Sequence, residues 1–136
     1  MTLLKFESLV VAGLLTMFAH PATAQSGSNR ERQSTLDGVY TVEQARRGEK
    51  VAKDVCSECH LPDWFTEVLI QTWTGAPLSM LYELMATTMP QDSPGGLTPQ
   101  QYADVLAYIF ELNELPAGRE ELRANKETLA AILIEK

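Results

Sequence analysis

The sequence predicts an all-α fold of three to five helices, and three observations lead to this class. Apolar residues recur at helical spacing in two stretches, 78–88 and 99–113. Helix-starting patterns occur at Thr41, Pro77 and Thr98. No stretch alternates apolar and polar residues for long enough to predict a strand. The chain of 136 residues, 45% hydrophobic and 21% charged, has room for one such domain.

The first predicted helix begins after Thr41 and runs to about Asp54. Thr41 and Gln44 have the spacing of a capping box, in which each side chain binds a backbone N–H of the first turn. Gly48 lies inside this helix, where glycine costs about 1 kcal/mol relative to alanine. We therefore expect another backbone to approach closely at Gly48, and the alternative is a glycine that the helix merely tolerates.

Two further helices have clear boundaries. One begins at Pro77, in a first-turn position where proline's missing N–H costs nothing, and ends at Met89 because the residue before Pro90 is disfavoured in a helix. After a loop over residues 91–96, Thr98 predicts the start of the last long helix, which continues to Asn113. Residues 66–74 are apolar without a regular period, so they predict no defined element.

The remaining segments divide the chain into four parts. Residues 1–24 predict a secretory signal peptide, because Lys5 precedes a short apolar run and the segment ends in Ala22-Thr23-Ala24. The alternative is a segment retained as an anchor. Residues 25–36 are polar and predict a flexible leader, 37–118 the folded domain, and 119–136 a partly helical tail packed on it. The expected location is the periplasm, with no membrane span after cleavage.

The chemistry is concentrated in the run Cys56-Ser57-Glu58-Cys59-His60. The spacing C-x-x-C-H is typical of covalent haem c attachment, in which two thiols bind the porphyrin and the imidazole binds its iron. Positions i, i+3 and i+4 of a helical turn share one face, so Cys56, Cys59 and His60 can reach the same flat ligand. The sequence therefore predicts one covalent haem c per chain, with His60 as the proximal ligand.

Other uses of the two cysteines fit less well. A structural zinc site needs four ligands, and the chain offers two cysteines and His60 in this region. An iron–sulfur cluster generally needs four cysteines. A redox dithiol or a simple disulfide remains open, although a thioredoxin-like motif belongs in a βαβ context that the sequence does not predict.

The second axial ligand follows from the inventory of the processed chain. Removal of residues 1–24 takes away His20, so His60 is then the only histidine. The candidates are methionines 80, 85 and 89, a lysine, or no ligand. We predict Met89, because it lies where a helix must end before a loop rich in proline and glycine; Met85 is the main alternative. Trp73 is a candidate donor to a haem propionate.

These residues together resemble those of class I monohaem cytochromes c. The resemblance rests on Gly48 ahead of the C-x-x-C-H run, on Met89-Pro90 some thirty residues later, and on the last helix with Tyr108. It implies a cytochrome c-like fold wrapped around one haem c, with the first and last helices crossing at Gly48 and Tyr108. More narrowly, residues 89–97 and 113–118 resemble those of the small cytochromes that accompany periplasmic quinoprotein alcohol dehydrogenases. The family often has an aromatic residue where this chain has Ala52.

The predicted function is electron transfer without catalysis of its own. The resemblance implies a quinoprotein dehydrogenase or respiratory donor and a terminal oxidase or other acceptor as partners. A net charge of −7, which loss of Lys5 and Glu7 leaves unchanged, argues against nucleic acid and anionic membranes. The alternative function is a haem-based redox or gas sensor with a labile distal ligand, and a peroxidase-like enzyme is the least favoured.

Overall fold

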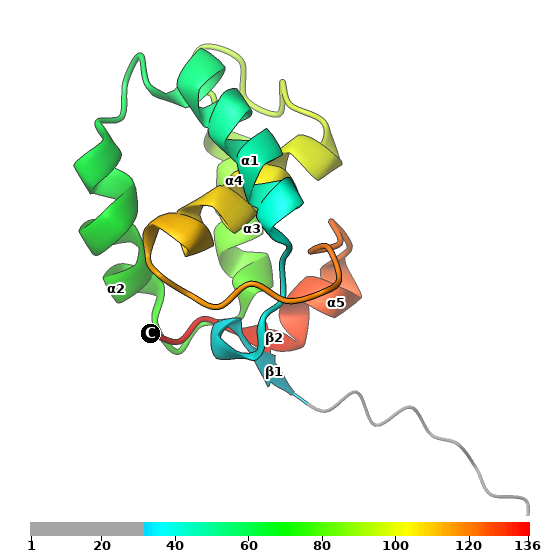
Figure 1. The fold of residues 1–136 in the computed structure, drawn as a ribbon. Helices are drawn as coiled ribbons and strands as arrows, with labels where there is room; N and C mark the ends of the chain where they lie inside the picture. Colours follow the sequence, from blue (N-terminus) through cyan, green and yellow to red (C-terminus); the bar gives the residue numbers. More distant parts are fainter. Residues whose placement is uncertain (1–31) are drawn as a thin grey trace, which may run out of the picture.

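The computed structural model describes residues 32–136, and helices predominate in this part of the chain (Figure 1). The predicted signal peptide, residues 1–24, and residues 25–31 of the predicted leader lie outside the described residues. The all-α prediction is confirmed. No helix among residues 32–136 combines the length and the apolar character that a membrane crossing requires. The α-helices are α1 (Val42–Val51), α2 (Leu69–Trp73), α3 (Leu78–Thr88), α4 (Pro99–Leu112) and α5 (Lys126–Ala130).

Helix ends that local sequence predicts are found where expected. The Thr41 side chain accepts a hydrogen bond from Gln44 N–H at the start of α1. Thr98 and Gln101 form the full capping box of α4, with Pro99 as its first residue. Helix α3 ends at Met89, whose backbone is extended (φ −122°, ψ 149°). Pro77 is the N-cap of α3 and lies just before its first turn.

Two segments differ from the predicted helices. Helix α1 ends at Val51, and the chain continues as a π-helical turn, Ala52–Cys56, in place of a regular helix to Asp54. A second π-helical turn, Trp64–Val68, leads directly into α2, where the sequence predicted no defined element. The wider π turns shift the residues that follow by a fraction of a turn, so they change which side chains face the core.

Helices α1 and α4 cross in close contact, with Gly48 at the crossing point. A Cβ atom at Gly48 would overlap the backbone carbonyl of Asp104 and would lie 2.9 Å from the amide nitrogen of Val105. The predicted close approach at Gly48 is therefore confirmed. Tyr108, which the family resemblance assigned to this contact, is half-buried one turn further along α4, within electrostatic range of Glu49 on α1 and Lys53 in the π turn that follows.

A buried polar network joins α1, α4 and the tail. The fully buried amide of Gln44 donates from Nε2 to Asp104 Oδ1 (3.1 Å) and to Leu122 O (2.9 Å), and its Oε1 accepts from Leu122 N–H (2.7 Å). Arg47 donates to the carboxylates of Glu121 and Asp104, and these hydrogen bonds raise the pKa of its guanidinium. The tail is thus fixed to the helix crossing by hydrogen bonds as well as by packing.

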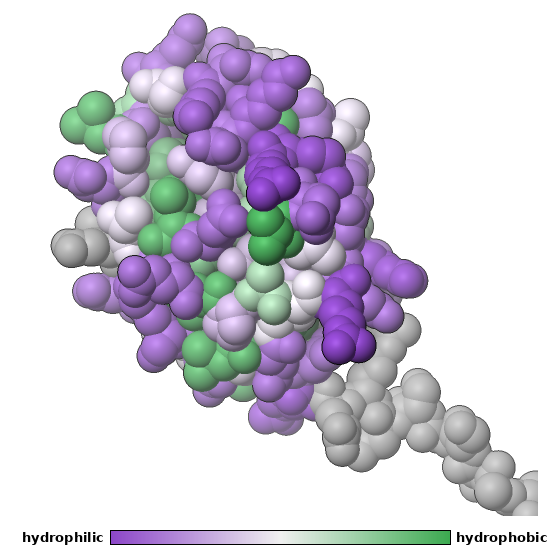
Figure 2. Space-filling model, in the orientation of Figure 1, coloured by the Kyte–Doolittle hydropathy of each residue, from purple (hydrophilic) through white to green (hydrophobic). Residues whose placement is uncertain are grey.

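The two ends of the described chain meet below the helices (Figure 1). Strand β1 (Gln33–Ser34) pairs in parallel with β2 (Ile132–Leu133), and the buried Thr35 hydroxyl donates to Glu135 O (2.7 Å) and accepts from Glu135 N–H (2.8 Å). Residues 33–35, which the sequence placed in the predicted leader, are therefore bound to the tail. The face shown in Figure 2 is mostly hydrophilic, with hydrophobic groups between the hydrophilic ones. The apolar residues of the tail are buried: Leu122, Leu129, Ile132 and Ile134.

Candidate functional site

The C-x-x-C-H run lies at the end of the π turn that follows α1. Backbone N–H groups of Cys59 and His60 both donate to the carbonyl of Cys56, at 3.1 and 2.9 Å, which folds the run into one tight turn. The turn directs all three predicted attachment residues toward the same cavity, whose volume is about 700 Å³. Cys56 is half-buried and Cys59 is exposed, so the attachment turn forms one edge of this cavity.

Helices α3 and α4 supply further walls of the same cavity. Met85 and Met89, both half-buried, line it from the end of α3. Tyr102, Val105 and Ile109 line it from the apolar face of α4. The structure thus brings Cys56, Cys59, His60 and Met89 to one cavity, as the sequence predicted for the attachment and axial ligands. The other lining residues are Asp54, Val55, Glu58, Trp64, Phe65, Pro90, Gln91, Asp92 and Leu97.

Aromatic rings pack on the imidazole of His60. The indole of Trp64 stacks on it, with ring centroids 4.3 Å apart and an interplanar angle of 26°, and Phe65 meets it edge-on at 5.8 Å. Both aromatic residues belong to the π turn before α2, and Trp64 keeps 38% of its surface exposed. The sequence did not predict these contacts, because the π turn that directs both rings at His60 has no sequence signature.

The charged residues that line the cavity are all acidic. Asp54, Glu58 and Asp92 are exposed and lie along its edge, and the lining residues that the structure describes include no lysine or arginine. Burial raises the pKa of the Cys56 thiol. The mouth of the cavity is therefore negatively charged, while the inner wall is apolar.

Two of the sequence candidates lie away from the cavity. Trp73, at the end of α2, is half-buried and packs against the hydrophobic core without lining the cavity. Met80 is 53% exposed and does not line it either. Among the methionines named as possible distal ligands, Met85 and Met89 are the two that the structure brings to the cavity.

Sequence reasoning missed a hydrogen bond at this site. The hydroxyl of Tyr102 donates to the backbone carbonyl of Met89 at 2.6 Å. Tyr102 lines the cavity together with Leu97. The available signal was a tyrosine, in place of a purely apolar residue, on a face that must be buried.

The cavity fits a haem by size, polarity and donor set. Its volume lies within the range of about 300–1,000 Å³ that is usual for cofactor sites. Two thiols, an imidazole and one thioether are the groups that bind a c-type haem and its iron; the cavity offers two thioethers, and its remaining wall is largely apolar. Among the side chains that the structure describes, those of residues 32–66 and 70–136, no three His, Cys, Asp or Glu groups are arranged to hold a metal ion by themselves. Cys56 and Cys59 are not joined to each other by a disulfide.

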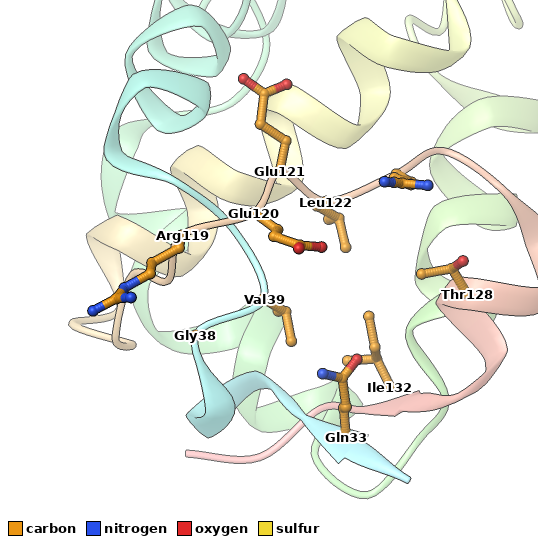
Figure 3. A pocket seen from close by; sticks show the side chains of 10 residues that line it. Gln33, Gly38, Val39, Arg119, Glu120, Glu121, Leu122, Thr128 and Ile132 are labelled. Atoms are coloured by element: carbon orange, nitrogen blue, oxygen red, sulfur yellow. The ribbon is translucent and has the colours of Figure 1, made fainter. Parts of the chain in front are cut away.

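A second hollow lies between the N-terminal segment and the tail (Figure 3). Its volume is about 350 Å³, and Val39, Leu122 and Ile132 form its apolar part while Glu120 and Arg119 extend from its edge (Figure 3). None of its described lining residues is a cysteine, histidine or methionine. It therefore contains none of the predicted site residues.

Comparisons with known proteins add no relative. No protein-family model matches the chain, and no curated protein or solved structure is significantly similar to it.

Proposed function

We propose that this chain is an exported electron-transfer protein with a cytochrome c-like fold, which carries one covalently attached haem c. One observation carries the proposal: Cys56, Cys59, His60 and Met89 all line one largely apolar cavity of about 700 Å³. These residues come from segments some thirty positions apart, and their types match the attachment and ligation of a c-type haem.

Each residue has a distinct task in this proposal. Cys56 and Cys59 would hold the haem through thioether bonds, and a ring nitrogen of His60 and the sulfur of Met89 would bind its iron. The group would supply one-electron chemistry when bound. A histidine and methionine pair would raise its reduction potential relative to more strongly donating ligands. With both residues on the iron, small ligands would be excluded, which favours electron transfer over catalysis.

The edge of the cavity suggests the kind of partner. The exposed Asp54, Glu58 and Asp92 form an acidic edge beside the exposed Cys59, so a partner with a basic patch would be attracted there. We expect a transient interface of less than about 1,200 Å², as is usual for redox encounters. A periplasmic quinoprotein dehydrogenase as donor and a terminal oxidase as acceptor fit this chemistry. Nucleic acid does not.

A sensor of gas or redox state is the second candidate. It is favoured by the position of Met89, which is followed by an exposed loop over residues 91–96. A ligand at the base of an exposed loop can leave the iron at little cost, and an open iron would then bind a diatomic gas.

The distal ligand is tested with two methionine variants of the haem-loaded protein. Met89→Ala should abolish the near-infrared Met-to-iron absorption band of the ferric form and allow the ferrous form to bind CO. Met85→Ala is the matched control, because Met85 lines the same cavity, and it should keep the band. If Met85→Ala loses the band and Met89→Ala keeps it, the ligand assignment is wrong. Avid CO binding by the wild-type protein would favour the sensor.

A further inference from the structure

The hydroxyl of Tyr102 connects the most firmly packed helix to the residue proposed as the distal ligand. Tyr102 is 3% exposed, and its hydroxyl donates to Met89 O at 2.6 Å. The same carbonyl accepts a longer hydrogen bond, 3.4 Å, from Gly95 N–H. A buried tyrosine hydroxyl normally keeps its partner, because leaving the hydroxyl unpaired costs its full desolvation penalty.

The position of Tyr102 is itself fixed from several sides. The capping box at Thr98 and Gln101 sets the start of α4, and Tyr102 directly follows Gln101. Its ring meets that of Tyr82 edge-on, with centroids 6.1 Å apart, so α3 and α4 hold the ring between them. Helix α4 is in turn fixed to α1 by the backbone contact at Gly48.

Met89 has little else to hold it. It follows the last turn of α3, where its N–H donates to Met85 O at 2.9 Å, and the residues after Pro90 are exposed as far as Gly96. The side chains of Met89 and Tyr102 both line the haem cavity. A bond to the Met89 carbonyl therefore limits how far the whole residue, with its sulfur, can move from the cavity.

We propose that Tyr102 is a positioning residue, whose hydroxyl holds the Met89 backbone so that the sulfur stays on the iron. The inference rests on the proposed function, in which Met89 is the distal ligand. The hydroxyl shifts one equilibrium, between Met89 bound to the iron and Met89 displaced from it, toward the bound state. Loss of one hydrogen bond of ordinary strength should favour the displaced state roughly fivefold.

The test is imidazole binding to the ferric holoprotein, followed by loss of the Met-to-iron band. Imidazole competes with Met89, so its apparent affinity reports the displaced state. Tyr102→Phe keeps the ring and removes the hydroxyl, and should bind imidazole roughly fivefold more tightly. Tyr82→Phe is the matched control: it removes a neighbouring hydroxyl that donates to Pro99 O at 3.4 Å and not to Met89. It should bind imidazole as the wild type does.

The outcomes separate this inference from the function on which it rests. If the wild-type protein shows the Met-to-iron band and Tyr102→Phe binds imidazole no more tightly than the wild type, the positioning role is overturned. The electron-transfer proposal then still stands. An equal effect in Tyr82→Phe also overturns it, since the cause would then be general loosening. A wild-type holoprotein without the band overturns both proposals.

A measurement on the wild-type protein covers the case in which Tyr102→Phe folds poorly. The Tyr102 hydroxyl proton should appear by NMR as a slowly exchanging resonance close to residues 89 and 90, and imidazole should abolish it. A resonance that imidazole leaves unchanged overturns the proposal.

Discussion

Substitution of Gly48 by alanine tests the helix crossing that supports the site. A Cβ at this position would overlap the Asp104 carbonyl and lie 2.9 Å from Val105 N, against 3.4 Å for an ordinary contact. The shortfall at Val105 N alone is 0.5 Å and the overlap with the Asp104 carbonyl is larger, so the helices must separate by more than 0.5 Å; the obstacle is backbone, which cannot rotate aside. Overpacking of this kind costs about 3 kcal/mol, and alanine's better helix propensity returns about 1 kcal/mol.

The expected net loss for Gly48→Ala is thus about 2 kcal/mol, which lowers the melting temperature by about 10 °C in a domain of this size. Urea unfolding followed by circular dichroism measures the free energy of unfolding directly. Arg46→Ala is the control, because Arg46 is an exposed residue of the same helix, and it should change stability little. The reasoning is refuted if Gly48→Ala proves as stable as the wild type, as helix propensity alone would predict.

Three further predictions concern the buried network, the thiols and the acidic edge. Gln44→Leu leaves the backbone N–H and C=O of Leu122 without their hydrogen-bond partner. The free energy of unfolding should therefore fall by about 3 kcal/mol. An unchanged urea midpoint contradicts this. Before haem attachment, Cys59 should react with iodoacetamide faster than Cys56 at neutral pH, because burial raises the pKa of the Cys56 thiol and so lowers its thiolate fraction. The rate of reaction at Cys56 should keep rising as the pH is raised. Equal rates at the two cysteines argue against the site geometry. Glu58→Lys should slow association with a basic redox partner and weaken the salt dependence of the association rate, as measured by stopped flow. Wild-type association rates that do not change with ionic strength exclude electrostatic steering.

Local signals in the sequence predicted the helix ends and the main residues of the site. Thr98 and Gln101 cap α4 through bonds within four residues of chain, and Pro90 stops α3 through a clash with its direct neighbour. The C-x-x-C-H spacing implies convergence of its side chains within one turn. Such features depend on a few adjacent residues, so one sequence suffices to predict them.

Features that depend on the path of the chain were not predictable. The π turn at Trp64–Val68 and the helix after it have no periodic signature, so the stacking of Trp64 on His60 was not foreseen. The Tyr102 bond to Met89 spans the loop between two helices, and its geometry depends on how that loop closes. The position of Trp73 also depends on the path of the chain. Although it is apolar and follows soon after His60 in the sequence, it packs on the core and does not line the cavity.

The pairing of the two chain ends was also beyond sequence reasoning. Strands of two residues, Gln33–Ser34 and Ile132–Leu133, are too short for an alternating pattern. Thr35 lies in a polar stretch that predicted a flexible leader, yet it is buried against Glu135, one hundred residues away. The apolar residues of the tail were the one feature of the sequence that indicated that the C-terminal segment covers the core.

The central claim, a haem bound through Cys56, Cys59, His60 and Met89, is tested most directly by one absorption spectrum of the exported wild-type protein. The spectrum should be that of a c-type haem that stays with the chain after denaturation, and the oxidised form should show the near-infrared Met-to-iron band. A colourless protein with two titratable thiols, or a haem that separates from the denatured chain, would contradict the claim.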